Sequence, residues 1–148
     1  MKKESGIVEE IFSATLGSSG LPRPIVQSLE LIEGYGIKDD KFANDDLSKT
    51  VMIIGQNSYD IAKENNIDLE YGSYGENILF DFDPHKLEIG TKLHVGDSII
   101  EITERCTICD HLSVFGAKLP KLIKKHRGMY CTILKSGKIT NNLSVTIH

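Results

Sequence analysis

The sequence has no excess of positive charge and no long hydrophobic run. It contains 17 Lys and Arg against 21 Asp and Glu, a formal net charge of −4. Nucleic acids and anionic membranes are usually bound by basic surfaces, so we expect neither as a partner. Its longest apolar runs, such as VMII and ENILF, have the length of strands, too short to cross a bilayer. The amino-terminal MKKESGIVEEIF lacks the apolar core of a signal peptide, so we expect a cytoplasmic protein.

Cysteine is scarce as well, with three residues. An odd number without a secretion signal argues against a disulfide framework. Cys106 and Cys109 have C-x-x-C spacing, which in a reducing compartment is typical of metal binding, sulfur transfer or redox chemistry. Cys131 lies in the strand pattern MYCTIL and is predicted to be a buried structural thiol.

Chain length and patterning predict a single, mostly β domain spanning residues 1–148. Short apolar segments are separated by Gly, Asp and Asn, as in a β-barrel with a few short helices. We expect strands at 6–12, 29–32, 51–54, 76–80, 92–95, 98–103, 129–134 and 139–147, and helices over 57–66 and 120–126. Two-residue hairpin turns are predicted at Gly96-Asp97 and at Ser136-Gly137.

The most informative stretch is SIIEITERCTICDHLSVFG. A strand pattern delivers Arg105, Cys106 and Cys109 just beyond its end. A nucleophilic or metal-ligating cysteine acts as a thiolate, which nearby cations favour, and Arg105 and His111 flank the pair. Thiolate sulfur suits molybdenum, zinc or copper. The alternative is a pair of structural thiols.

Several further segments follow in a fixed order. They are LPRPIVQSLEL, GYGIKDDKFA, YGSYGENILF, LEIGTKLHVGD, ERCTIC and HRGMYCTILKSGKI. Their succession, from about residue 21 to 143, resembles the MOSC domain found in molybdenum cofactor sulfurases and in small stand-alone bacterial proteins. Its most specific part is the ordered set GEN, IG…G, a late cysteine and RG-x-Y…L-x-x-G. The resemblance implies a MOSC-type, pyruvate-kinase-barrel-like β-barrel that binds the molybdenum cofactor (molybdopterin) or a sulfur species.

The resemblance also implies roles for the thiols. Cys109 matches the family's cysteine that is thought to ligate molybdenum or carry sulfur, and Cys106 is an extra thiol of some shorter members. A persulfide fits this chemistry, because its sulfur is a polarizable nucleophile. The sequence departs from the family at Asp39, at Phe42, where many members have histidine, and at Asn141-Asn142. The pyridoxal-phosphate-dependent desulfurase domain is absent, so we do not expect pyridoxal phosphate.

Polar residues before an apolar strand form a second candidate group. Gly75, Glu76 and Asn77 open the segment at 76–80 and are candidates to hold a polar or cationic group at the barrel mouth. The alternative is that Gly75 permits a bulge while Glu76 points to solvent. His85 and His94 are isolated and receive no role.

Three cations are candidates for holding an anionic cofactor. Arg127 precedes Gly128, which permits close approach of the backbone to a ligand. Arg23 lies between two prolines, and Lys41 follows two acids. An arginine can bind phosphate through two parallel hydrogen bonds. The alternative for each is an ordinary solvated surface charge.

We therefore expect a MOSC-type protein that binds a molybdenum-pterin ligand or carries sulfur, with Cys109 as key thiol and metal ligand. The expected ligand is an anionic pterin or a sulfur donor. The expected protein partner is a desulfurase or a molybdoenzyme. Reduction of N-hydroxylated compounds and sulfur transfer both remain open. The alternative is a non-catalytic zinc or thiol module using Cys106, Cys109, His111 and a fourth ligand.

Overall fold

The computed structural model describes residues 3–14, 22–107 and 110–148. Within them, no helix is long and apolar enough to span a bilayer. The strands there are β1 (Lys3–Ile11), β2 (Leu29–Ile32), β3 (Gly36–Ile37), β4 (Val51–Gly55), β5 (Ile78–Phe80), β6 (Lys92–Val95), β7 (Ser98–Arg105), β8 (Met129–Lys135), β9 (Gly137–Ile139) and β10 (Ser144–Ile147). The α-helices are α1 (Gln56–Glu64) and α2 (Leu119–Ile123), and short 3-10 helices are η1 (Leu47–Lys49), η2 (Pro84–Lys86) and η3 (Asp110–Val114).

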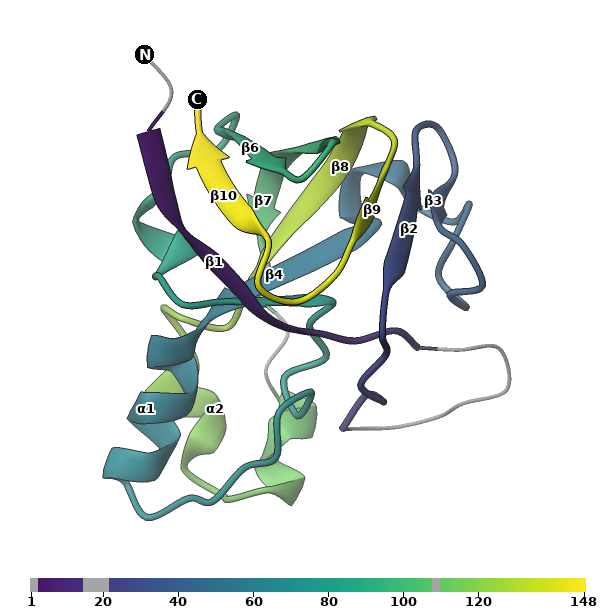
Figure 1. Cartoon of the computed structure of the whole chain (residues 1–148). Coiled ribbons are helices and arrows are strands. Elements are labelled where there is room, and N and C mark those ends of the chain that lie inside the picture. Colours follow the sequence, from purple (N-terminus) through teal and green to yellow (C-terminus); the bar gives the residue numbers. More distant parts are fainter. Residues whose placement is uncertain (1–2, 15–21, 108–109) are drawn as a thin grey trace.

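Seven strands close into a barrel, as Figure 1 shows. Their order is β1-β10-β6-β7-β8-β4-β5, and β5 pairs with β1 to complete the ring. The pair of β4 and β5 is parallel, whereas the other barrel pairs are antiparallel. A three-stranded sheet of β3, β2 and β9 lies beside the barrel. The predicted mostly β barrel is confirmed.

The barrel interior is filled by residues that alternate along the strands. On β8, Met129, Cys131 and Ile133 are buried in the main core, whereas Tyr130 between them faces a pocket. This is the period of two that a half-buried strand requires. Cys131 is fully buried, as predicted.

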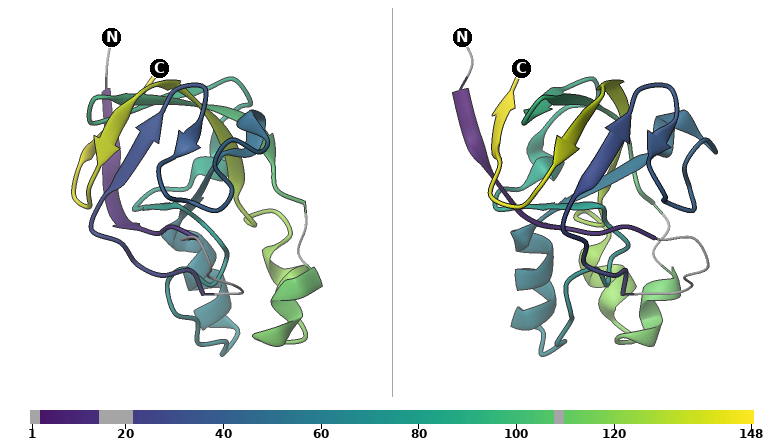
Figure 2. Two further views of the ribbon diagram at one scale, coloured as in Figure 1. Left: turned by 90° about the vertical axis from the view of Figure 1, so that its right-hand side faces the viewer. Right: turned by 45° about the vertical axis from the view of Figure 1, so that its right-hand side comes forward.

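The two helices pack together at one end of the barrel, as both views of Figure 2 show. A second apolar cluster lies between them and the barrel, and it includes Phe12, Ile54, Tyr59, Tyr74, Leu79, Leu119 and Ile123. Helix α1 follows β4 without a loop, and Gly55 is its N-cap. A Cβ at Gly55 would lie 2.2 Å from the carbonyl oxygen of Phe82, so only glycine fits this junction.

The predicted strands and helices are largely confirmed, with shifts of a few residues at their ends. The Gly96-Asp97 hairpin is confirmed, because Val95 pairs with Ser98 across it and Gly96 has φ +58°. The predicted Ser136-Gly137 hairpin is wrong, since β9 leaves the barrel to pair with β2. The single strand predicted over 139–147 is also wrong. It is divided into β9 and β10 by a turn at Asn142, whose φ of +70° interrupts a strand.

Candidate functional site

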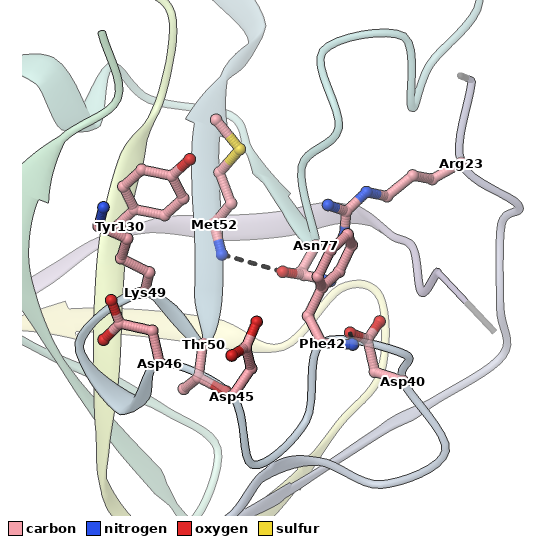
Figure 3. Close-up of a pocket in the computed structure, with 10 residues that line it drawn as sticks. All are labelled: Arg23, Asp40, Phe42, Asp45, Asp46, Lys49, Thr50, Met52, Asn77 and Tyr130. Atoms are coloured by element: carbon pink, nitrogen blue, oxygen red, sulfur yellow. Dashed lines mark hydrogen bonds between the residues drawn. The ribbon is translucent and has the colours of Figure 1, made fainter. Parts of the chain in front are cut away.

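A pocket of about 210 Å³ opens on the barrel beside β4 and β8. Figure 3 shows Met52 and Tyr130 side by side on these strands, with Arg23 on the opposite wall. The lining residues are Arg23, Asp40, Phe42, Asp45, Asp46, Lys49, Thr50, Met52, Asn77 and Tyr130. The chain between β3 and β4 supplies six of these ten, so a long connection forms most of the pocket wall.

Arg23 is held against an aromatic ring inside this pocket. Its guanidinium carbon lies 5.1 Å from the centroid of the Phe42 ring, and Lys41 Nζ lies 5.3 Å from the same centroid. Both distances are within the range of a cation–π interaction. Burial lowers the pKa of Arg23, and the charges of Asp40 and Glu76 oppose this shift. Phe42, where many family members have histidine, therefore positions two cations, a role that sequence reasoning missed.

Asp40 fixes the loop that carries Phe42. Its carboxylate accepts hydrogen bonds from Ser13 Oγ at 2.9 Å, the Ala14 amide at 2.8 Å and the Phe42 amide at 3.0 Å. This carboxylate therefore stabilises the loop. Three acids and two cations line the pocket, so it lacks the excess of positive charge expected around an anion site.

Glu76 is completely buried. Its Oε2 accepts hydrogen bonds from the Tyr59 hydroxyl and, at 3.4 Å, from the Gly72 amide. Among the described residues, Oε1 has no hydrogen-bond partner. Burial raises the pKa of Glu76, and the bond from Tyr59 opposes this rise. The alternative that Glu76 points to solvent is wrong, because its side chain is completely buried, and the preceding Gly75 has φ +80°.

The side chain of Asn77 connects β4 to Phe12, the residue that follows β1. Its Oδ1 accepts from the Met52 amide at 2.9 Å, a bond drawn in Figure 3, and its Nδ2 donates to the Phe12 carbonyl at 3.2 Å. Both polar atoms of the amide are thus used by backbone groups of the fold. Asn77 positions the pocket wall.

Arg127 is buried, with an exposed fraction of 4%. Its Nη1 donates to the Tyr74 carbonyl oxygen at 2.5 Å. The neighbouring Gly128 has φ +136°, and a Cβ there would lie 2.5 Å from Met52 Cε. In this structure, the close approach that Gly128 permits is to Met52 of β4. This close approach brings the backbone next to Arg127 against β4, whose Met52 lines the pocket.

Cys106 follows the last residue of β7, where the sequence predicted it. Its amide donates to the Gly128 carbonyl at 3.0 Å, and its Sγ donates to the Tyr130 hydroxyl at 3.4 Å. The side chain is buried, with Cys106 only 3% exposed. Burial and the Cys106 thiol raise the pKa of Tyr130 to about 12. Tyr130 therefore joins the first thiol of the C-x-x-C segment to the pocket.

The remaining predicted residues divide into two groups. The Arg105 guanidinium donates a hydrogen bond to the His85 carbonyl oxygen at 3.1 Å, and this bond joins Arg105 to the η2 turn. Cys109 and the side chain of His111 lie outside the described residues. The structure thus gathers Arg23, Asn77 and Tyr130 at one pocket. Tyr130 was missed, although it is the tyrosine of the RG-x-Y segment.

Other charges connect the buried residues to this pocket. Arg23 and Arg127 both act electrostatically on the Tyr130 hydroxyl, and Glu76 acts on Arg23. Glu76 and Arg127 therefore lie near the pocket, although neither is among its lining residues. The geometry can therefore bind a planar or anionic group at Arg23 and Phe42, next to a thiol-bearing segment.

Comparison with solved structures agrees with the observed fold. The YuaD protein of Bacillus subtilis has a TM-score of 0.82 and 13% identity, covering 100% of this chain and 98% of that one. YiiM of Escherichia coli has a TM-score of 0.70 and 14% identity, covering 96% and 69%. YiiM of Geobacillus stearothermophilus has a TM-score of 0.69 and 15% identity, covering 100% and 75%. At these identities the likeness is one of fold.

Sequence comparison gives the family. No curated protein matches the sequence. The pattern of the MOSC domain matches residues 39–146, most of the chain and the whole segment from the pocket loop to β10. The resemblance drawn from the ordered motifs is confirmed, and the chain belongs to the MOSC domain family.

Proposed function

We propose that this chain binds the molybdenum cofactor at the pocket of Arg23, Phe42 and Tyr130. Membership of the MOSC family supports a function related to this cofactor in general terms. The observation that carries the finer proposal is the position of Tyr130. It lines the pocket and also bonds Cys106, so a ligand in the pocket would lie beside the C-x-x-C segment.

Although three acids line the pocket, the part formed by Arg23, Phe42 and Tyr130 suits an anionic, planar ligand. A guanidinium binds a phosphate through parallel hydrogen bonds and loses little freedom when an aromatic ring already holds it. Arg23 meets this description, because the Phe42 ring lies 5.1 Å from its guanidinium carbon. Phe42 and Tyr130 both line the pocket and offer aromatic surface to a pterin ring. Arg23 would therefore hold the phosphate and the two rings would contact the pterin.

Cys109 is the thiol that we propose for the chemistry. The cofactor, when bound, supplies a redox-active molybdenum ion, and thiolate sulfur is a suitable ligand for it. The same sulfur could instead carry a sulfane sulfur as a persulfide. Cys106 and Cys131 are less suited to either role, because both are buried. We also propose that residues 1–148 form one domain and that the protein acts in the cytoplasm with a desulfurase or a molybdoenzyme.

Metal and sulfur analysis tests this proposal. The full chain is purified from cells that overproduce the cofactor, and its molybdenum, pterin and cyanide-releasable sulfur are measured. Molybdenum and pterin in equal amounts support cofactor binding, and Cys109→Ser should lose the metal or the sulfur while Cys131→Ser retains both. Purified protein without molybdenum, pterin or labile sulfur would refute the proposal. Zinc bound through Cys106 and Cys109 would favour the zinc module instead.

A further inference from the structure

A second group of potential ligands lies outside the pocket. Asp83, His85 and His126 place one ligand atom each within 4.8 Å of one another. Asp83 and His85 come from the η2 turn after β5, and His126 lies between α2 and β8. His85 was given no role from the sequence, because nothing in the spacing shows that the two segments meet.

The spacing of these atoms suits a small metal ion. Asp83 Oδ1 lies 2.8 Å from His85 Nδ1, and Asp83 Oδ2 lies 3.6 Å from His126 Nδ1. Zinc bonds of about 2.0–2.1 Å in a tetrahedral site separate neighbouring ligands by about 3.3 Å. The two observed distances lie on either side of this value but involve different oxygens of Asp83, and the three ligand atoms lie within 4.8 Å of one another, so the side chains must adjust for one ion to bind.

All three ligands are held by their own backbone or by neighbouring elements. The Asp83 carboxylate accepts the His85 amide at 3.0 Å. The His126 carbonyl accepts from Ser58 Oγ at 2.7 Å, which fixes it to the first turn of α1. Such anchoring reduces the entropy lost when a metal binds, and it resembles the outer-shell support of metal sites.

Two polar atoms at this cluster lack partners. Among the described residues, His85 Nε2 and Asn57 Oδ1 are buried without a hydrogen bond. The side chain of His85 is 3% exposed, that of Asp83 11% and that of His126 31%. Asn57 Nδ2 lies 3.2 Å from His126 Nδ1, so Asn57 belongs to the same cluster. Buried polar atoms without partners are rare in native proteins, and either ring nitrogen of His85 can serve as a metal ligand. His126 is the most exposed of the three proposed ligands.

We propose that Asp83, His85 and His126 bind a divalent transition-metal ion of the zinc type. Two imidazoles and one carboxylate are a donor set that zinc accepts, with water at the fourth position. The ion would join the η2 turn to the segment that continues into Arg127 and Gly128. Because Arg105 donates to the His85 carbonyl at 3.1 Å, the same turn also contacts the end of β7. A bound ion would thus stabilise Arg105, which precedes Cys106, and the segment of Gly128, whose carbonyl accepts the Cys106 amide.

Binding of Zn²⁺ to the full chain tests this proposal. Affinity and stoichiometry are measured by competition with a chromogenic chelator, in the wild type and in a Cys109→Ser background that removes the C-x-x-C pair. We expect one ion per chain and a rise in Tm on binding, because the ion favours the folded state. His126→Ala and Asp83→Asn should each weaken binding by at least about tenfold, the lower end of what loss of an outer-shell partner alone costs.

Two variants serve as matched controls. His94 lies in β6, with its ring 3.9 Å from that of His148, so His94→Ala removes a histidine that is not in the cluster. His94→Ala and Arg23→Ala should both retain full Zn²⁺ affinity, and the second separates this site from the proposed cofactor pocket. No Zn²⁺ binding by the wild type, or equal binding by His126→Ala, would overturn the proposal. Strong near-ultraviolet thiolate absorption on Co²⁺ substitution in the Cys109→Ser background would also overturn it.

Discussion

Replacement of Asn77 by alanine removes the side chain that connects Phe12, the residue after β1, to β4 at the pocket. The amide accepts from the Met52 N–H at 2.9 Å and donates to the Phe12 carbonyl at 3.2 Å. Met52 and Phe12 are themselves buried, so alanine leaves a buried donor and a buried acceptor without partners. Each such group costs about 1–3 kcal/mol. Asn77→Ala should therefore lower the free energy of unfolding by about 2–6 kcal/mol, a large part of the about 5–15 kcal/mol of a typical domain.

Urea unfolding followed by circular dichroism measures this loss. The midpoint should fall while the dependence on urea concentration stays the same, because the folded surface is little changed. Asn141→Ala is the matched control, since Asn141 is exposed on a turn, and it should change stability by less than about 0.5 kcal/mol. A loss below about 1 kcal/mol for Asn77→Ala would refute the inference that its amide holds the pocket wall.

Three further predictions follow from buried groups. Burial raises the pKa of Glu76, so the folded protein retains that proton to higher pH than the unfolded chain, and stability falls as the pH rises above about 4.5. Glu76→Gln should weaken this decline in urea titrations at several pH values, and an unchanged decline would contradict the assignment. Gly128→Ala should lower the free energy of unfolding by about 1–3 kcal/mol, because an alanine is strained at the φ of +136° that Gly128 adopts. A measurement of Tm tests this, and an unchanged Tm would count against the account. In Cys109→Ser protein, Cys106 and Cys131 should react slowly with a thiol reagent until urea unfolds the chain, because both are buried and burial also raises the pKa of Cys131. Rapid labelling of the native variant would argue against their burial.

Most barrel strands could be predicted because their signals are local. Runs such as 51–54 and 98–103 alternate or cluster apolar residues between turn-forming ones, and Gly96-Asp97 is a turn signal by itself. The two-residue β3 was missed because it is too short to show a period. The pairing of β9 with β2 was missed because it joins strands far apart in the chain, and a turn signal cannot specify the partner.

The candidate site could be predicted only in part, for a similar reason. Arg23, Asn77 and Arg127 were recognisable as polar or charged residues near motif segments, but their contacts depend on the closed barrel. Tyr59 bonds Glu76 across the interface between helix and barrel. The cluster of Asp83, His85 and His126 also forms only when distant segments meet. Spacing in the sequence carries no signal for such contacts.

The molybdenum content of two single variants tests the central claim most directly. Wild type, Arg23→Ala and Lys121→Ala are purified from the same cofactor-producing cells, and molybdenum and pterin are measured per chain. Arg23 lines the pocket, whereas Lys121 is exposed on α2. A charge-assisted hydrogen bond contributes about 1.5–3 kcal/mol, so Arg23→Ala should weaken cofactor retention by about tenfold or more while Lys121→Ala retains it. Equal retention by all three proteins, or equal loss in both variants, would contradict a specific cofactor pocket at Arg23.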